Sequence, residues 1–322
     1  MLGKKLGVDL GTSTVRVVTR GEATLIAEPA VVAIREGEAG LTLLGTAALE
    51  AAIEDRTVEL RRPMQGGDVR DHQALTALLH LAVNRAVGRQ RIFKPDIVVA
   101  VRAGMSGDDR RAVLEAASRA GARTVYLIDA AIAAAMGAGL SVTSAQAHLV
   151  IDIGAGKTDI AVLALEGTVA ARSLVRGSED LLDQLGAHVE AVHDAVLDRA
   201  ELRSVAHLLV AASHEERTAE ISGVLLSSHE LSTLVAEYLR PLDTALLEVL
   251  DETPAALHRD VHSTGIVLTG GGARLEGIER HVAHLAGASA RVAGEPEQCT
   301  VRGTGLAVDN LDVLRRNFMY IR

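Results

Sequence analysis

Two short segments combine an aspartate at the end of an apolar run with a turn of small residues. In the first, Asp9 precedes Gly11, Thr12, Ser13 and Thr14. In the second, Asp152 precedes Gly154, Ala155, Gly156, Lys157 and Thr158. Such turns let backbone N–H groups converge on an anionic oxygen, because no bulky side chain stands in the way. Either turn alone is typical of an ordinary hairpin, but the repetition with an aspartate at each favours phosphate binding.

The two aspartates carry the wrong charge to bind phosphate themselves. Their charge suits the water shell of Mg²⁺, which usually keeps several waters and takes one or two carboxylates. We therefore predict a Mg²⁺–nucleotide site that holds the metal through Asp9 and Asp152 via water. A third turn of small residues, Gly270, Gly271 and Gly272, follows another apolar run and would let a flat ligand lie against the backbone.

Strands must position these turns. Apolar runs at 7–10, 15–18 and 30–34 predict an antiparallel meander around the first turn. Runs at 148–152 and 160–163 repeat the pattern around the second turn, about half the chain away. This repeat predicts an α/β fold of two similar lobes with a ligand cleft between them.

Helices and a buried strand are predicted between and after the turns. Apolar spacing indicates a helix after Asp71, residues 96–101 indicate a buried strand, and Ser106 provides the N-cap of a further helix. A helix over 234–250 is expected to break or kink at Pro241.

Composition narrows the function classes. The 322 residues include 33 Lys+Arg against 42 Asp+Glu, a formal charge of −9 without a basic tract, so we expect no nucleic-acid partner. The single cysteine, Cys299, is expected to be a buried thiol. No signal peptide or membrane span is recognisable, and this predicts a cytoplasmic protein. Among twelve histidines, His188 and His193 show no partner set for a metal and are expected on a solvated helix face.

Several ordered segments carry a more specific resemblance. They are Asp9-Leu10-Gly11-Thr12, 28–34, Arg62-Pro63-Met64, 127–129 running into 133–140, Asp152-Ile153-Gly154 and 268–272. Together they resemble the actin-like ATPase superfamily, and within it the MreB cell-shape family, from about residue 7 to 316. The resemblance implies an actin fold with two core subdomains flanking a nucleotide, each carrying a small inserted subdomain. The first core would comprise 1–34, 62–144 and 300–322, with 35–61 as its small subdomain; the second would comprise 145–187 and 232–299, with a reduced small subdomain at 188–231.

The resemblance also implies a function. It points to an ATP- and Mg²⁺-binding protein that forms homopolymers at the inner face of the cytoplasmic membrane and organises cell shape with cell-wall synthesis proteins. By position, the two Gly/Thr turns would hold the phosphates and the Gly270–Gly272 turn would face the adenosine. Asp9, Asp129, Asp152 and Thr158 would be the catalytic residues.

The chain departs from the family where the attacking water is positioned. The family carries Glu-Glu-Pro, whereas this chain has Asp129-Ala130-Ala131. An alanine cannot orient water, so we expect ATP to bind but to be hydrolysed slowly, unless Asp129 takes over the role. Lys157 stands where the family has threonine and would either contact a phosphate, which we favour, or point into solvent.

Two further sites follow from the resemblance. Glu201 matches best the family's nucleoside-contacting glutamate, although Ser204 replaces the lysine that accompanies it. Ile92 and Phe93, set among basic residues, match a hydrophobic membrane loop; the alternative is that Phe93 is a buried edge residue.

Two other classes share the core fold. A non-polymerising nucleotide-binding chaperone or regulatory protein is the main alternative, but no substrate-binding domain is recognisable in the sequence. A sugar or acetate kinase would need an acceptor pocket for which no motif is evident. The segment Arg62-Pro63-Met64 and the Glu28-Pro29 strand favour the MreB family over both.

Overall fold

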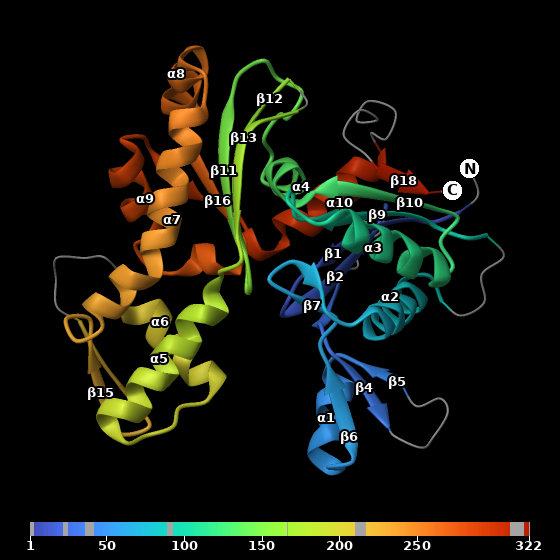
Figure 1. The fold of residues 1–322 in the computed structure, drawn as a ribbon, viewed down its shortest axis with the longest axis horizontal. Coiled ribbons are helices and arrows are strands. Elements are labelled where there is room, and N and C mark those ends of the chain that lie inside the picture. The colour runs from blue at the N-terminus through green and yellow to red at the C-terminus, as the bar shows by residue number, and fades with distance from the viewer. Residues whose placement is uncertain are drawn as a thin grey trace. The chain divides into compact units, whose positions relative to one another are not determined.

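The computed structural model divides the chain into two compact units. One comprises Met1–Ser141 with Gln298–Arg322, and the other comprises Val142–Glu297 (Figure 1). The structure describes residues 3–21, 25–35, 42–88, 93–165, 167–209, 217–309 and 319–321. Within these ranges, no helix has the length and apolar character needed to cross a bilayer.

The first unit is built on a six-stranded sheet in the order β18-β10-β9-β1-β2-β3. Its strands are β1 (Lys5–Leu10), β2 (Thr14–Thr19), β3 (Leu25–Pro29), β9 (Asp96–Val101), β10 (Thr124–Asp129) and β18 (Met319–Ile321). β1 pairs antiparallel with β2 and parallel with β9. Every residue of β9 is buried, as expected for a central parallel strand covered on both faces.

Four helices of the first unit pack around this sheet. They are α2 (His72–Val87), α3 (Gly107–Arg119), α4 (Ala130–Gly137) and α10 (Cys299–Asp309). Two of them, α2 and α3, begin where the sequence predicts a helix. The Asp71 carboxylate accepts from the N–H of Ala74 at 2.8 Å, and the Ser106 hydroxyl accepts from the N–H of Asp109 at 3.0 Å. The predicted N-cap at Ser106 is therefore confirmed, and the helix predicted after Asp71 is capped by Asp71 itself.

Small residues let α4 and α10 pack with their backbones in contact. A Cβ on Gly303 would collide with the carbonyl of Ala133, and one on Gly137 would collide with the carbonyl of Cys299. Cys299 is fully buried at this crossing, as expected. α10 also packs on β1 and β9, so this close contact supports β1, the strand that leads into the first turn (Figure 1).

One strand prediction is wrong. The third strand of the opening meander is β3, whereas the run at 30–34 contributes to β4 (Val32–Arg35) in a separate three-stranded sheet. That sheet, ordered β5-β4-β6, also contains β5 (Thr42–Leu44) and β6 (Val58–Arg61), with α1 (Thr46–Glu54) packed on it. A short β7–β8 ribbon (Met64–Gln65 and Asp68–Val69) follows.

The second unit repeats the central part of the first. Its sheet runs β13-β12-β11-β16-β17, formed by β11 (His148–Ile153), β12 (Thr158–Ala164), β13 (Gly167–Leu174), β16 (Ile266–Thr269) and β17 (Ala290–Val292). Two antiparallel pairings precede two parallel ones, as in β3-β2-β1-β9-β10. The internal repeat predicted from the two turns is therefore a real duplication of sheet topology.

The remaining elements of the second unit are mainly helical. They are α5 (Ser178–His193), α6 (Arg199–Leu209), the hairpin β14–β15 (Thr218–Ile221 and Val224–Ser227), α7 (Ser232–Glu252), α8 (Ala255–Thr264), η1 (Gly271–Arg274), α9 (Ile278–Ala286) and η2 (Pro296–Gln298). α7 is continuous, with Pro241 inside it, so of the two outcomes expected at Pro241, a break or a kink, the break does not occur. Its apolar residues Leu239, Leu242 and Leu246 are buried in the core of this unit and hold the helix in place.

Candidate functional site

The second glycine turn is held by the start of α5. The N–H of Gly154 donates to the carbonyl of Lys157 at 2.8 Å, which closes the turn between β11 and β12. The N–H groups of Ser178 and Glu179 donate to the carbonyls of Gly154 and Ala155 at 2.9 and 2.8 Å. The turn therefore has a fixed shape before any ligand arrives.

Gly177 permits this contact, because a Cβ there would collide with the carbonyl of Ala155. The Asp180 carboxylate accepts from the N–H of Gly177 at 2.7 Å and fixes the first turn of α5. Sequence reasoning overlooked Gly177, although Gly-Ser-Glu-Asp before an apolar run is a helix-start signal.

Lys157 lies against Asp159 and not in open solvent. Its ammonium pairs with Oδ2 of Asp159, and the two side chains are 15% and 4% exposed. The other oxygen, Asp159 Oδ1, is buried without a hydrogen-bond partner among the described residues. Thr158 is also buried, and its hydroxyl donates to the carbonyl of Arg176 at 2.8 Å. Lys157 thus places a cation at the turn, and this cation forms an ion pair with the carboxylate of Asp159.

Asp152 is fixed by a residue that the sequence analysis assigned no role. Thr269, the last residue of β16, donates from its hydroxyl to Asp152 Oδ1 at 2.9 Å. Both side chains are buried, and the two residues are parallel partners in the sheet. The carboxyl ends of β11 and β16 therefore meet at one edge and bring Asp152 beside the third glycine turn.

The three glycines of that turn differ in their surroundings. Gly270 has a φ of +79°, and a Cβ there would collide with the carbonyl of Ile153; a Cβ on Gly272 would collide with the Ile153 side chain. Gly271 differs, because nothing lies within 4 Å of the position of its Cβ and the residue is exposed. The fold thus requires glycine at 270 and 272, whereas the bare backbone at Gly271 faces open space.

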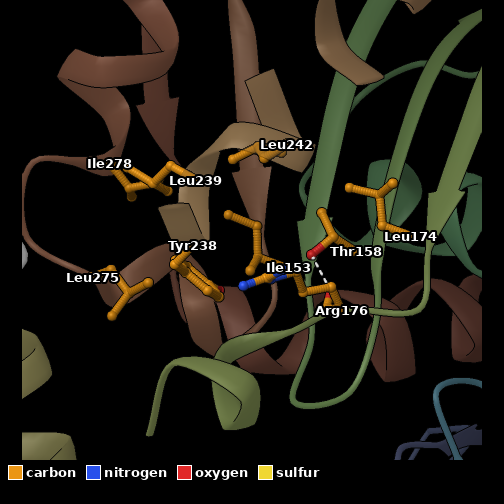
Figure 2. A pocket seen from close by; sticks show the side chains of 9 residues that line it. All are labelled: Ile153, Thr158, Leu174, Arg176, Tyr238, Leu239, Leu242, Leu275 and Ile278. Carbon is orange, nitrogen blue, oxygen red and sulfur yellow. Dashed lines mark hydrogen bonds between the residues drawn. The ribbon is translucent and has the colours of Figure 1, made fainter. Parts of the chain in front are cut away.

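A narrow apolar pocket opens beside Thr158. Figure 2 shows the Arg176 guanidinium next to the ring of Tyr238, with its carbon 5.5 Å from the ring centroid. Arg176 Nε is buried without a hydrogen-bond partner among the described residues. Burial raises the pKa of Tyr238. The remaining lining is aliphatic, from Ile153, Leu174, Leu239, Leu242, Leu275 and Ile278. The pocket offers a cationic, aromatic wall that the sequence analysis did not identify.

The first glycine turn lies in the other unit. The N–H of Gly11 donates to the carbonyl of Thr14 at 3.2 Å, and the N–H of Ala30 donates to the carbonyl of Ser13 at 2.8 Å. Asp9 is paired across the strands with Arg16, whose Nη1 lies 3.7 Å from Asp9 Oδ2. The turn matches the second one in type, but its aspartate has a cationic neighbour.

Asp129 ends β10 immediately before α4. Arg110 Nη2 lies 3.4 Å from Asp129 Oδ1 and also donates to the carbonyl of Ala103 at 2.8 Å. Ala130 is 3% exposed and forms the first residue of α4. The carboxylate nearest the expected water-positioning place is therefore already engaged by a cation.

Glu201 makes local contacts with both carboxylate oxygens. Oε2 accepts from the N–H of Asp198 at 2.7 Å, while the Asp198 carboxylate accepts from the N–H of Glu201 at 2.9 Å, a reciprocal capping box. Oε1 accepts from the hydroxyl of Ser222. These contacts account for Glu201 without a ligand and anchor the β14–β15 hairpin to α6.

Of the two expected membrane-loop residues, Ile92 lies outside the described residues. Phe93 is 50% exposed, so the alternative that it is a buried edge residue is wrong.

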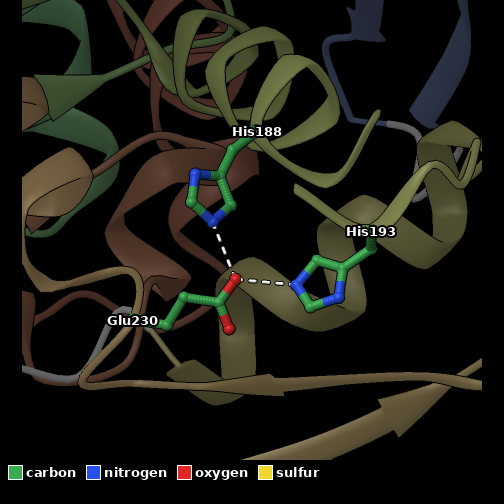
Figure 3. Close-up of side chains that lie close together, drawn as sticks. All are labelled: His188, His193 and Glu230. Carbon is green, nitrogen blue, oxygen red and sulfur yellow. Dashed lines mark hydrogen bonds and ion pairs between the residues drawn. The ribbon is translucent and has the colours of Figure 1, made fainter. Parts of the chain in front are cut away.

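The expectation that His188 and His193 lack a partner set is also wrong. Figure 3 shows both rings directed at Glu230. His188 Nε2 and His193 Nε2 lie 2.8 and 2.7 Å from the same oxygen, Glu230 Oε1. Neither histidine is simply solvated, and the cluster is unrelated to the glycine turns.

Comparisons with known proteins agree with the duplicated fold. The MreB/Mbl protein family model matches residues 3–316. The cell shape-determining protein MreB of Escherichia coli K12 is 30% identical, over 97% of this chain and 95% of that protein. The cell shape-determining protein Mbl of Bacillus subtilis 168 is 27% identical, over 98% of both.

Solved structures give the same fold. MreB5 of Spiroplasma citri bound to ADP superposes with a TM-score of 0.86 at 23% identity, over 98% of this chain and 99% of that one. The structure of the MamK double helical filament superposes with a TM-score of 0.77 at 21% identity, over 95% of this chain and 98% of that one. A whole-length family match, a 30% identical relative and the shared topology establish that this chain belongs to the MreB/Mbl family of actin-like proteins.

Proposed function

We propose that this protein binds ATP with Mg²⁺ and assembles into filaments that determine cell shape. The observation that carries the proposal is the arrangement at the ends of β11 and β16. There, Thr269 fixes Asp152, and Gly271 presents bare backbone to open space where the fold itself does not need glycine. A fixed carboxylate suits a hydrated Mg²⁺, and bare backbone suits a flat ligand.

The relatives support the nucleotide part of the proposal. The matched MreB5 structures of Spiroplasma citri are bound to ADP and to AMPPNP. Phosphates would lie at the turns 11–14 and 154–158, each closed by backbone hydrogen bonds. Lys157 would add a cation, with Asp159 as a positioning residue that limits its reach. Glu201 is a weaker candidate for the ribose, because its oxygens have local partners.

We infer slow hydrolysis from the environment of Asp129 and Ala130. A group that orients the attacking water must present an available acceptor at the right place. Ala130 has no such group, and Asp129 is held by Arg110. ATP would therefore persist on the protein, which favours a long-lived assembled state.

Filament formation and membrane association are further parts of the proposal. MamK forms a double helical filament, and the curated relatives are cell shape-determining proteins. The half-exposed Phe93 and the neighbouring exposed Lys94 suit shallow insertion among anionic headgroups at the inner face of the membrane. Cell-wall synthesis proteins would be the partners of such a filament.

The four-subdomain division also enters as a proposal. The β5-β4-β6 sheet with α1 would be the small subdomain predicted at 35–61, beginning with Val32 because β4 belongs to this sheet. α6 and the β14–β15 hairpin would form the reduced one at 188–231.

The test is a thermal melt of the purified chain with ATP and Mg²⁺, followed by sedimentation and electron microscopy. A ligand that binds the folded state must raise the melting midpoint. We expect a raised midpoint, ATP-dependent pelleting and visible filaments. No shift with saturating ATP or GTP would contradict nucleotide binding. A shift without pelleting or filaments would favour the non-polymerising regulatory protein.

A further inference from the structure

The His188, His193 and Glu230 side chains form a compact donor set within the second unit. Both imidazole Nε2 atoms approach one carboxylate oxygen, and the three candidate ligand atoms lie within 4.8 Å of one another. The rings are inclined at 62° to each other, with centroids 6.5 Å apart, so they converge without stacking (Figure 3). Three converging ligand atoms from two separate segments are more than a chance surface pair.

The backbone holds each donor in place. His193 is the last residue of α5, and Asp194 follows in the left-handed conformation, with φ 50° and ψ 39°, which ends the helix there. The N–H of Glu230 donates to the hydroxyl of Ser227 at 3.1 Å, and the fully buried Leu231 anchors the next position. Little backbone rearrangement is needed to keep the donor atoms together.

The donor chemistry selects the class of metal. Imidazole nitrogen with one carboxylate suits Zn²⁺ and its transition-metal neighbours, whereas Mg²⁺ prefers oxygen ligands alone. In a tetrahedral zinc site with bonds of 2.0–2.2 Å, neighbouring ligand atoms lie about 3.4 Å apart. In this cluster the two histidine Nε2 atoms lie 2.8 and 2.7 Å from Glu230 Oε1, closer than in a zinc site, and all three atoms lie within 4.8 Å of one another. Small side-chain rotations would therefore admit the ion, with its fourth coordination position left for water.

The charge of the cluster also suits a dication. Glu230 contributes a carboxylate, and the ion would replace the hydrogen bonds between Glu230 Oε1 and the two Nε2 atoms, because imidazole binds a metal in its neutral form. The His and Glu side chains are 24–25% exposed, so an ion can reach them from solvent.

We propose that His188, His193 and Glu230 bind a divalent transition metal of the zinc class, which clamps the end of α5 to the segment that enters α7. The chain between His193 and Glu230 contains α6 and the β14–β15 hairpin, so the clamp closes the small segment of the second unit into a loop. The proposal is independent of nucleotide binding.

The test is a zinc titration of the full chain against a chromogenic chelator, with melting midpoints measured in parallel. We expect one Zn²⁺ to bind per chain. Binding at this site should raise the melting midpoint with Zn²⁺ but not with Mg²⁺. Co²⁺ bound as a probe should give visible absorption bands. His193→Gln and Glu230→Gln should each weaken Zn²⁺ binding at least about tenfold, since even outer-shell changes cost this much.

His281→Gln is the matched control. His281 Nε2 lies 2.6 Å from Asp243 Oδ1, with 24% and 29% exposure, but this pair has one histidine where the proposed site has two. Zinc affinity should be unchanged in this variant. Equal binding by wild type, His193→Gln and Glu230→Gln overturns the proposal. A metal-free midpoint that falls in Glu230→Gln, while Zn²⁺ stabilises no variant, overturns it too and leaves a hydrogen-bonded cluster.

Discussion

The hydroxyl of Thr269 donates to Asp152 Oδ1 at 2.9 Å, and both residues are buried at the ends of neighbouring parallel strands. Because Thr269 pairs directly with Asp152 in the parallel register, its hydroxyl lies beside the carboxylate, and rotation of the aspartate would break this bond. The relationship joins two segments that the sequence separates by 117 positions, and it sets the direction of the carboxylate proposed to hold hydrated Mg²⁺.

Thr269→Val removes the hydroxyl and keeps the shape of the side chain. Leaving a buried acceptor one donor short costs about 1–3 kcal/mol of stability. We expect ATP affinity in Mg²⁺ to fall roughly tenfold, or about 1.4 kcal/mol, and affinity in EDTA to stay the same. Isothermal titration calorimetry measures both. Thr253→Val is the control, because that buried hydroxyl donates to a helix carbonyl, Val249 O; an equal loss in both variants would argue against a specific role for Thr269.

Ala130→Glu should raise steady-state phosphate release by restoring a carboxylate before α4. Ala130 is buried, so the longer side chain carries a steric cost. Ala130→Gln carries the same cost without the charge and should remain slow. Asp129→Ala should change little, because Arg110 already engages that carboxylate. Substantial wild-type release that disappears in Asp129→Ala would transfer the role to Asp129.

His148 makes stability depend on pH. Burial lowers the pKa of His148 from its ordinary value of 6.5, partly offset by Asp260, and its Nδ1 is buried without a hydrogen-bond partner among the described residues. The unfolded chain therefore binds more protons than the folded one as pH falls through 6.5, so this site lowers the free energy of unfolding in acid. When urea titrations at pH 7.5 and 5.5 are compared, the free energy of unfolding should fall less in His148→Gln than in wild type as the pH is lowered. Equal losses would show that His148 does not contribute.

Phe93→Ser should weaken sedimentation with anionic vesicles. Burying a phenylalanine contributes about 1.5–3 kcal/mol, enough to shift the bound fraction clearly. Leu247→Ser is the control, because Leu247 is 48% exposed and Phe93 is 50% exposed. Unchanged binding by Phe93→Ser, or an equal loss in both variants, would contradict a membrane role for Phe93.

Local signals were sufficient to predict much of the fold. The N-caps at Asp71 and Ser106 and the repeated strand–turn–strand pattern depend on neighbouring residues, so the sequence displays them directly. The run at 30–34 has the composition of a strand, but composition does not say which sheet it joins. Pairing with β5 and β6 is a tertiary contact, which explains the misplaced third strand.

The site was predicted unevenly for the same reason. The turns were visible as glycine patterns, whereas Thr269 and Glu230 act on residues far away in the sequence. The capping role of Glu201 could have been predicted locally, because Asp198 and Glu201 have capping-box spacing. The family resemblance pointed instead to a nucleoside contact. Lys157 and Asp159 are two positions apart, which in an extended segment places them on one face.

The most direct measurement of the central claim compares ATP·Mg²⁺ binding by wild type, Gly271→Ala and Gly107→Ala. A Cβ at either position meets open space, and neither glycine needs a positive φ, so both variants should fold like wild type. If ATP lies against the backbone at Gly271, titration calorimetry should give wild-type affinity for Gly107→Ala and at least tenfold weaker binding for Gly271→Ala. Wild-type affinity in Gly271→Ala, or no ATP binding by the wild type, would contradict the account.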